Sequence, residues 1–236
     1  MRATAGFLLV MLLLVVAACG GSDETSTEGA ATEGAATDAT ETTDTAATEA
    51  TETDADLQTF EVESAGFSLG VPSSWKGLDG DDFAKSGALE EFGKENPSLA
   101  PYLSALQAGN SPMKLLAADP ELEDNFATNV NVLVQDVPEG TSAKDYLEGN
   151  RSGLSSQLDI EGTIESEEID HEVGDAAVAR YRANLNSGGQ KQTFSFVQYY
   201  FVNGTDAYVV TYTTLPQVED RYQDVFETSA ASFRFL

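Results

Sequence analysis

Apolar and polar residues alternate along much of the chain after residue 57, and a period of two predicts β-strands. The clearest runs span residues 59–63, 66–71, 130–134, 174–185 and 208–212, with a short strand at 113–117 and an exposed acidic strand at 159–170. The run from Thr193 to Val202 is apolar on both faces, so we expect it in the middle of a sheet. Asp119-Pro120 and Asn203-Gly204 are expected turns.

Four segments follow a helical spacing instead. Residues 82–95 and 98–108 are the first two, Ser142-Ala143-Lys144-Asp145 is a capping-box pattern that begins the third, and Pro216 begins the fourth. Helices mixed with meandering strands predict an α+β fold, with a mainly antiparallel sheet and helices on both faces.

The amino-terminal segment predicts where the protein is located. Residues 5–18 carry no charge, which is typical of the apolar part of a secretory signal peptide and too short to cross a bilayer well. The run ends in Val16-Ala17-Ala18-Cys19, which resembles the lipobox of bacterial lipoprotein signal peptides. This resemblance implies that Cys19 receives a diacylglyceryl group and that residues 1–18 are removed. We expect a lipid anchor on the extracytoplasmic face of the cell membrane; a chance cysteine after an ordinary signal peptide, or an uncleaved anchor, is the alternative.

Residues 19–56 differ in composition from the remainder of the chain. After Cys19 the segment holds 11 Thr and 11 Asp or Glu, with no Lys, Arg or aromatic residue. Such a segment buries too little apolar surface to offset its loss of conformational entropy, so we expect a disordered tether. Residues 57–236 then form a single globular domain.

The net charge of −28 limits the possible partners. Nucleic-acid binding needs a basic face, and we therefore exclude it. One cysteine and one histidine leave no ligand set for a Cys- or His-based metal site. The acidic groups at 79–82 and 119–124 could hold Ca²⁺, but they lack the EF-hand spacing, so we expect solvated charge and no metal. No sequence motif indicates a cofactor, and we expect a monomer.

Three stretches resemble one known family. Residues 65–75, which read AGFSLGVPSSW, look like the opening hairpin and P-x-x-W turn of the Mog1/PsbP-like fold, and residues 126–132 look like its next core strand. The end, with Ser232-Phe233-Arg234, is similar to the closing helix and SFR sequence of that fold. With the lipobox, residues 58–236 look most like actinobacterial LpqN-type lipoproteins. The resemblance implies an α/β/α sandwich and non-enzymatic binding, and the helical segment 79–111 departs from its pattern.

One motif favours an enzyme. Gly66-Phe67-Ser68-Leu69-Gly70 matches G-x-S-x-G, the nucleophile elbow of α/β-hydrolases, and His171 follows in the order that a triad allows. An elbow needs a sharp turn from strand to helix, whereas the motif continues a period-two strand pattern and Pro72 follows it. We therefore expect an ordinary strand serine and no enzyme, with a serine hydrolase as the minor alternative.

The candidate binding residues are Trp75, Tyr102, Arg180 and Arg182. The two arginines share one face of a strand and are candidates for an anion or partner contact; the alternative is pairing with the acidic residues 165–168. Trp75 is a candidate pocket wall or else a packed core residue. Tyr102 lies in segment 97–109, which is either a mobile cover over the sheet or an ordinary packed helix.

These patterns favour a non-catalytic binding module that recognises a protein or a cell-envelope component. The alternative is a carrier of an apolar small molecule or lipid, which predicts a sizeable cavity between the sheet and the helices.

Overall fold

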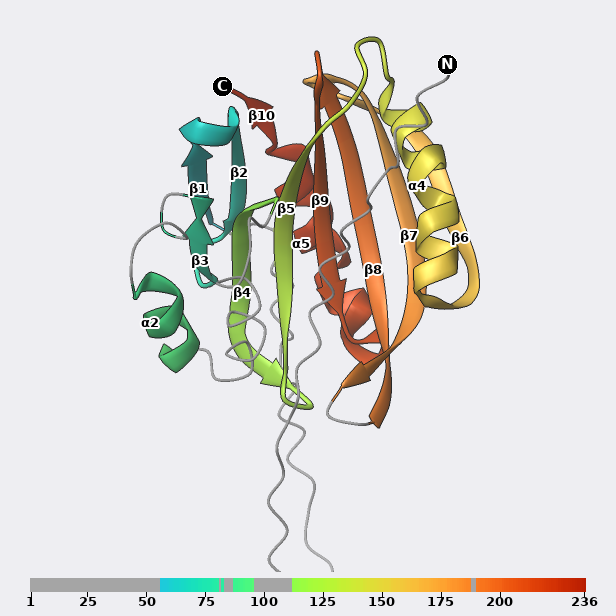
Figure 1. Cartoon of the computed structure of the whole chain (residues 1–236). Coiled ribbons are helices and arrows are strands. Elements are labelled where there is room, and N and C mark those ends of the chain that lie inside the picture. The colour runs from blue at the N-terminus through green and yellow to red at the C-terminus, as the bar shows by residue number, and fades with distance from the viewer. Residues whose placement is uncertain (1–55, 81, 83–86, 96–111, 188–189) are drawn as a thin grey trace, which may run out of the picture.

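The structure is a computed structural model that describes residues 56–80, 82, 87–95, 112–187 and 190–236 (Figure 1). The expected signal peptide, Cys19, nearly all of the tether and the segment that holds Tyr102 lie outside the described residues. Within them the chain forms a large and a small antiparallel sheet. The elements in chain order are β1 Leu57–Val62, η1 Glu63–Ala65, β2 Phe67–Pro72, β3 Lys76–Asp79, α2 Ala88–Glu95, β4 Met113–Glu123, β5 Phe126–Asp136, α4 Ala143–Gln157, β6 Asp159–His171, β7 Gly174–Ser187, β8 Gln190–Asn203, β9 Asp206–Thr214, η3 Pro216–Val218, α5 Glu219–Ala231 and β10 Arg234–Phe235.

The large sheet has seven described strands in the order β3-β4-β5-β9-β8-β7-β6, and all neighbouring pairs are antiparallel. β8 lies between β9 and β7, which confirms the central strand predicted from the apolar run at Thr193–Val202. One edge is β3, with 4 residues, and the other is β6, with 13 residues.

The two faces of the large sheet carry separate cores. On one face, which we call the α4 face, α4 packs against β6, β7 and β8. On the opposite face, which we call the α5 face, α5 and the small sheet form the second core. Figure 1 shows α4 in front of the large sheet and α5 behind it. This arrangement confirms the predicted α+β class with helices on both faces.

The small sheet joins the two ends of the domain. β2 lies between β1 and β10, so the last strand pairs with a strand near the start of the domain. Phe233, which precedes β10, is fully buried, and its ring stacks on Phe201 with the centroids 4.3 Å apart. The Ser232-Phe233-Arg234 sequence resembles the end of the Mog1/PsbP-like fold, and the structure places this end of the chain in a second sheet.

The turn predicted at Asp119-Pro120 is wrong. β4 continues through both residues, and the chain turns at Asp124 and Asn125, whose φ angles are 48° and 62°. Proline has no N–H to donate, but the register of β4 against β5 shifts across Pro120, and such irregularities tolerate proline. Asp and Asn adopt positive φ more readily than most other residues, so they supply the turn.

Both predicted C-terminal helices are confirmed. At the start of α4, Ser142 Oγ accepts a hydrogen bond from the Asp145 N–H at 3.0 Å, as the capping-box pattern predicts. Pro216 begins the 3₁₀ turn that leads into α5. α5 buries Tyr222 and Val225 against the sheet, as its helical spacing predicts.

Candidate functional site

The edge strand β6 presents an acidic rim. In the described part of the chain β6 is paired on one side only, with β7. Ile164 is its one buried residue, and it carries the carboxylates of Asp159, Glu161, Glu165, Glu167, Glu168 and Asp170. The outer backbone groups of an edge strand are open to a further strand. We call β6 with these carboxylates the β6 rim.

Arg180 and Arg182 project from β7 on the α5 face, next to the β6 rim. Arg180 donates to Glu167 Oε1 at 2.7 Å, which is the pairing with the acidic strand that the sequence left open. Arg182 instead donates to Glu219 Oε2 at 2.7 Å, at the start of α5. The hydrogen bond and the negative charge of Glu219 raise the pKa of Arg182.

Solvent reaches both ion pairs. The side chain of Arg180 is 41% exposed and that of Arg182 is 51% exposed. Exposed pairs of this kind contribute about 0–1 kcal/mol, so little free energy opposes an exchange of partner. The two arginines therefore offer exchangeable positive charge beside the exposed carboxylates of the β6 rim.

Trp75 lies in the core of the α5 face rather than at a surface. It is 3% exposed, and its ring meets Tyr222 edge to face with the centroids 6.4 Å apart. The Trp75 carbonyl accepts a hydrogen bond from Gln58 Nε2 at 2.6 Å, which fixes the turn between β2 and β3. The side chain is packed inside the protein, which is the second of the two interpretations of this residue.

Ser68 lies inside a regular strand. It belongs to β2, where it aligns with Glu61 of β1 and with Arg234 of β10, and the next element after β2 is the strand β3. A nucleophile elbow places its serine at a strained turn from a strand to a helix, so the G-x-S-x-G match does not form an elbow here.

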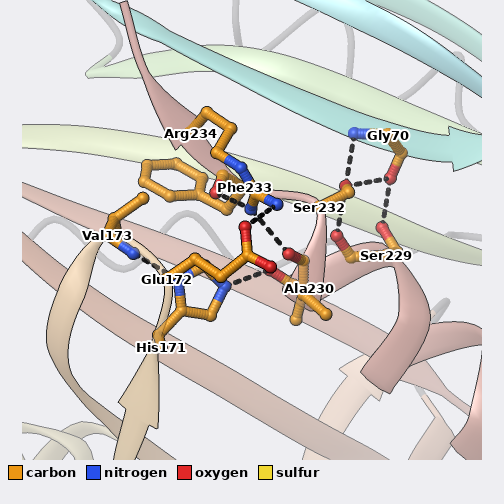
Figure 2. Close-up of polar contacts among 10 residues, drawn as sticks. Gly70, His171, Glu172, Val173, Ser229, Ala230, Ser232, Phe233 and Arg234 are labelled. Atoms are coloured by element: carbon orange, nitrogen blue, oxygen red, sulfur yellow. Dashed lines mark hydrogen bonds and ion pairs between the residues drawn. The ribbon is translucent and has the colours of Figure 1, made fainter.

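His171 is held by backbone groups at the corner between β6 and β7. Its Nδ1 accepts the Val173 N–H at 3.2 Å, and its Nε2 lies 3.1 Å from the Ala230 carbonyl oxygen at the end of α5 (Figure 2). With Nδ1 accepting, Nε2 is the nitrogen that donates. Both ring nitrogens are engaged in tying the β6–β7 turn to α5, so His171 is a structural residue in this geometry.

The same corner locks the C-terminus onto β2. Ser232 Oγ accepts the Gly70 N–H at 2.7 Å, and Ser229 Oγ donates to the Gly70 carbonyl (Figure 2). A Cβ at Gly70 would lie 2.8 Å from Ser232 Oγ, so only glycine allows this close approach. Arg234 pairs with Glu172 beside it, and the corner supports the fold rather than chemistry.

The acidic group at residues 119–124 makes structural contacts. Asp119 accepts a hydrogen bond from the Tyr222 hydroxyl at 2.7 Å, and Asp124 accepts one from Gln217 Nε2 at 2.8 Å. Burial and the Asp119 hydrogen bond raise the pKa of Tyr222 to about 12.

Among the described residues, no three His, Cys, Asp or Glu side chains gather closely enough to hold a metal ion. Across the same residues, no helix is both long and apolar enough to cross a membrane.

A group of buried polar residues that the sequence analysis missed lies on the α4 face. The pairing of β5, β9 and β8 aligns Asn129 with Thr213, and it aligns Asn131 with Thr211 and then Gln198. All five side chains are buried. We call these five residues the polar patch. Five amide and hydroxyl side chains side by side in a sheet core are unusual, because buried polar groups cost free energy unless they are hydrogen-bonded.

The sequence contains a signal for the polar patch. Asn129 and Asn131 alternate with Val130 and Val132, and the valines lie in the core of the α5 face. In a strand with both faces covered, the alternate positions must also be buried, so the amides point into the second core. Periodicity alone places them on the opposite face from the valines, but it does not show that this face is covered.

No family model and no curated protein matches the chain. The solution structure of PsbP from the cyanobacterium Synechocystis sp. PCC 6803 aligns with 77% of this chain and 94% of its own, at 16% identity and a TM-score of 0.49. LpqN of Mycobacterium tuberculosis, a protein involved in cell envelope biogenesis, aligns with 75% of this chain and 90% of its own, at 12% identity and a TM-score of 0.45. A Pseudomonas aeruginosa protein of unknown function aligns with 75% and 94%, at 10% identity and a TM-score of 0.45. PsbP and LpqN, which the sequence motifs resemble, are thus both among the similar structures, and the likeness concerns the fold alone.

Proposed function

We propose that this chain is a non-catalytic binding module that a lipid anchor at Cys19 holds on the extracytoplasmic face of the cell membrane. It recognises a protein or another component of the cell envelope, as a monomer and without a cofactor. The lipobox supports the location, and the β6 rim supports the binding role.

The β6 rim is the observation that carries the proposal. An edge strand of 13 residues, paired on one side in the described chain, can accept an extended segment by strand addition. The row of carboxylates favours a segment that carries Lys or Arg. The same charge repels a second copy of the rim, so two molecules are not expected to pair edge to edge.

The candidate binding residues take different places in this proposal. Arg180 and Arg182 stand beside the rim and can exchange Glu167 and Glu219 for a carboxylate of the partner. Trp75 is buried and acts through the position of the β2–β3 turn. Tyr102 stays a candidate contact outside the described residues.

The two alternatives receive less support from the described geometry. A carrier of an apolar molecule requires an apolar lining, whereas the centre of the α4 face holds the amides and hydroxyls of the polar patch. A serine hydrolase requires a histidine aimed at Ser68, whereas both ring nitrogens of His171 meet backbone groups.

The test is capture from a cell-envelope extract with the full lipidated chain. The informative variant is the double substitution Glu161→Lys and Glu165→Lys, which reverses two exposed charges on the rim. Its matched control is Glu121→Lys with Glu139→Lys, which makes the same change of charge at exposed positions away from β6. We expect the rim variant to lose a captured component that the wild type and the control variant both retain.

Two results would contradict the proposal. Wild type that enriches nothing over an immobilised tether of residues 19–56 shows no binding by the domain. Equal capture by the rim variant and the control shows that binding does not use the rim. The anchor is tested separately, by metabolic labelling with palmitate, and we expect Cys19→Ala to abolish the label.

A further inference from the structure

The β6 rim consists of two regular stretches separated by a bulge. Residues 159–161 and 165–171 pair with β7 in register, and the register shifts between the two stretches. From Glu161 to Glu165 the chain advances four residues along β6, whereas the paired positions on β7 advance only two. Gly162 lies within this shift and has a φ angle of 80°, a value that glycine adopts without strain. Such a bulge disrupts the hydrogen-bond ladder locally, and sheets use bulges to protect their edges.

The bulge limits how much of the rim a further strand can use. The Ile164 side chain is buried in the core of the α4 face, and the Ile164 carbonyl accepts a hydrogen bond from Arg151 of α4 at 2.8 Å. A strand that lies along the rim cannot keep one regular register across this point. We therefore expect a partner strand to pair on one side of the bulge only.

The longer stretch, residues 165–171, has the properties of an edge that can accept a strand. All seven of its residues pair with β7 in an unbroken register. It contains neither proline nor lysine, which natural proteins place on edge strands to prevent pairing. Its outer side faces no other strand of the described chain, as the position of β6 in Figure 1 shows. Seven residues also exceed the usual strand length of about 5–6.

The α5 face of this stretch carries two carboxylates followed by an apolar side chain. Glu165 and Glu167 are exposed, and Ile169 packs at the margin of the α5-face core. Arg180 aligns with Glu165 but donates to Glu167. Residues directly opposite one another on neighbouring strands stabilise the pair when their charges are opposite or when both are apolar. The face therefore favours a strand with basic, basic and apolar residues opposite Glu165, Glu167 and Ile169.

The α4 face of the same stretch is less selective, because cations of the protein already contact it. Lys144 of α4 pairs with Glu168 at 3.1 Å, and Arg151 donates to Ser166 Oγ at 3.4 Å. A partner side chain on this face meets these cations as well as the carboxylates. The preference for basic residues therefore comes mainly from the α5 face.

We infer that residues 165–171 bind an extended segment, antiparallel to β6, with the pattern apolar-x-basic-x-basic. Read from the amino end of that segment, the three side chains lie opposite Ile169, Glu167 and Glu165. The antiparallel direction continues that of the described strand pairs of the large sheet. This inference rests on the proposed function and specifies the partner of the same site.

The first test compares two blocked peptides of equal composition and charge. Thr-Thr-Val-Thr-Lys-Thr-Lys has the inferred order, and Lys-Thr-Lys-Thr-Val-Thr-Thr is its reverse. Each carries a neutral dye, and its fluorescence anisotropy is measured against the full lipidated chain in detergent. We expect the first peptide to bind roughly three- to tenfold more tightly, because its three favourable cross-strand pairs form in the antiparallel direction. No binding, equal binding, or tighter binding of the reversed peptide overturns the inference.

The second test uses the bulge as an internal control. Glu165→Lys and Glu161→Lys make the same change of charge at exposed positions of β6, on the two sides of the bulge. We expect Glu165→Lys to weaken binding of the first peptide by roughly tenfold and Glu161→Lys by less than about twofold. Equal losses would mean that the peptide responds to the charge of the whole rim, which overturns the assignment to residues 165–171.

The outcome for this inference is distinguishable from that for the proposed function. Rim-dependent capture from the envelope extract, without discrimination between the two peptides, refutes the inferred pattern and leaves the binding role of the rim intact. The absence of rim-dependent capture refutes the proposed function itself.

Discussion

The buried polar groups on the two faces of the large sheet differ in how completely they are hydrogen-bonded. On the α5 face, the Tyr212 hydroxyl donates to Ser229 Oγ at 2.8 Å, and Ser229 in turn donates to the Gly70 carbonyl. On the α4 face, Gln198 donates to Thr211 and accepts from Tyr200, but Asn129 Oδ1 and the Tyr181 hydroxyl have no partner among the described residues.

The hydrogen-bonded groups of the α5 face stabilise the fold, whereas the unpaired atoms of the α4 face do not. On the α5 face, the contacts of Ser229 with Tyr212 and Gly70 tie β9 and β2 to the end of α5, so their loss removes long-range constraints. The unpaired atoms of the α4 face make no such connection within the described residues. Natural cores accept such groups mainly where they serve binding or catalysis.

High pH should produce the largest effect, and it should act on both faces. Burial raises the pKa of Tyr212 on the α5 face and of Tyr200 and Tyr181 on the α4 face above the ordinary value of a phenol. Below pH 10 the phenols are neutral in the folded and unfolded chains. Above it the unfolded chain releases their protons while the folded chain retains them, so stability falls as the pH rises. We expect phenolate absorbance and loss of circular dichroism to develop together above pH 10. Phenolate formation in a folded chain would contradict the burial of these rings.

Truncation of the aromatic cluster on the α5 face should produce the next largest effect. Phe233→Ala removes a fully buried ring that stacks on Phe201 and Phe67. We expect a loss of about 3–5 kcal/mol in the free energy of unfolding, measured by urea denaturation. A loss below about 1 kcal/mol would mean that the C-terminus is not part of the core.

Removal of one paired hydroxyl on the α5 face should have an intermediate effect. Ser229→Ala leaves the Tyr212 hydroxyl without its acceptor and the Gly70 carbonyl without this donor. We expect a loss of about 1–3 kcal/mol, because two buried groups lose a partner. Ser156→Ala is the control, since its hydroxyl is exposed and donates to the Gly153 carbonyl of the same helix.

The rim variants should have the smallest effect on stability. Glu161 and Glu165 are exposed, and reversing their charge should change the free energy of unfolding by less than about 0.5 kcal/mol each. Urea denaturation of the double variant checks this value. A larger loss would show that the rim supports the fold and would remove the basis for assigning its carboxylates to a partner.

The sequence predicts local features of this protein well and long-range ones poorly. The cap at Ser142 and the strand at Thr193–Val202 follow from patterns within a few residues, and both are confirmed. The predicted turn at Asp119-Pro120 is wrong. A local rule for proline takes no account of the shift in strand register that allows a proline within β4. The pairing of β10 with β2 depends on residues more than 160 positions apart, which no periodicity reveals.

The candidate sites show the same limit. The alternation around Arg180 and Arg182 correctly places both on one face, but the partner of Arg182 is on α5 and not on the neighbouring strand. The polar patch requires the registers of two strand pairs before its members can be recognised as neighbours. In this fold, candidate sites are therefore recognised from which strands lie side by side and less from sequence motifs.

One pair of variants tests the contrast between the faces most directly: Tyr181→Phe on the α4 face and Tyr212→Phe on the α5 face. Each loses one buried hydroxyl and keeps its ring, and of the two only the Tyr212 hydroxyl has a partner among the described residues. In urea denaturation of the full chain, we expect Tyr212→Phe to lose about 1 kcal/mol in the free energy of unfolding and Tyr181→Phe to lose nothing or to gain stability. An equal loss in both variants would contradict the account, because the two faces would then use their polar groups in the same way.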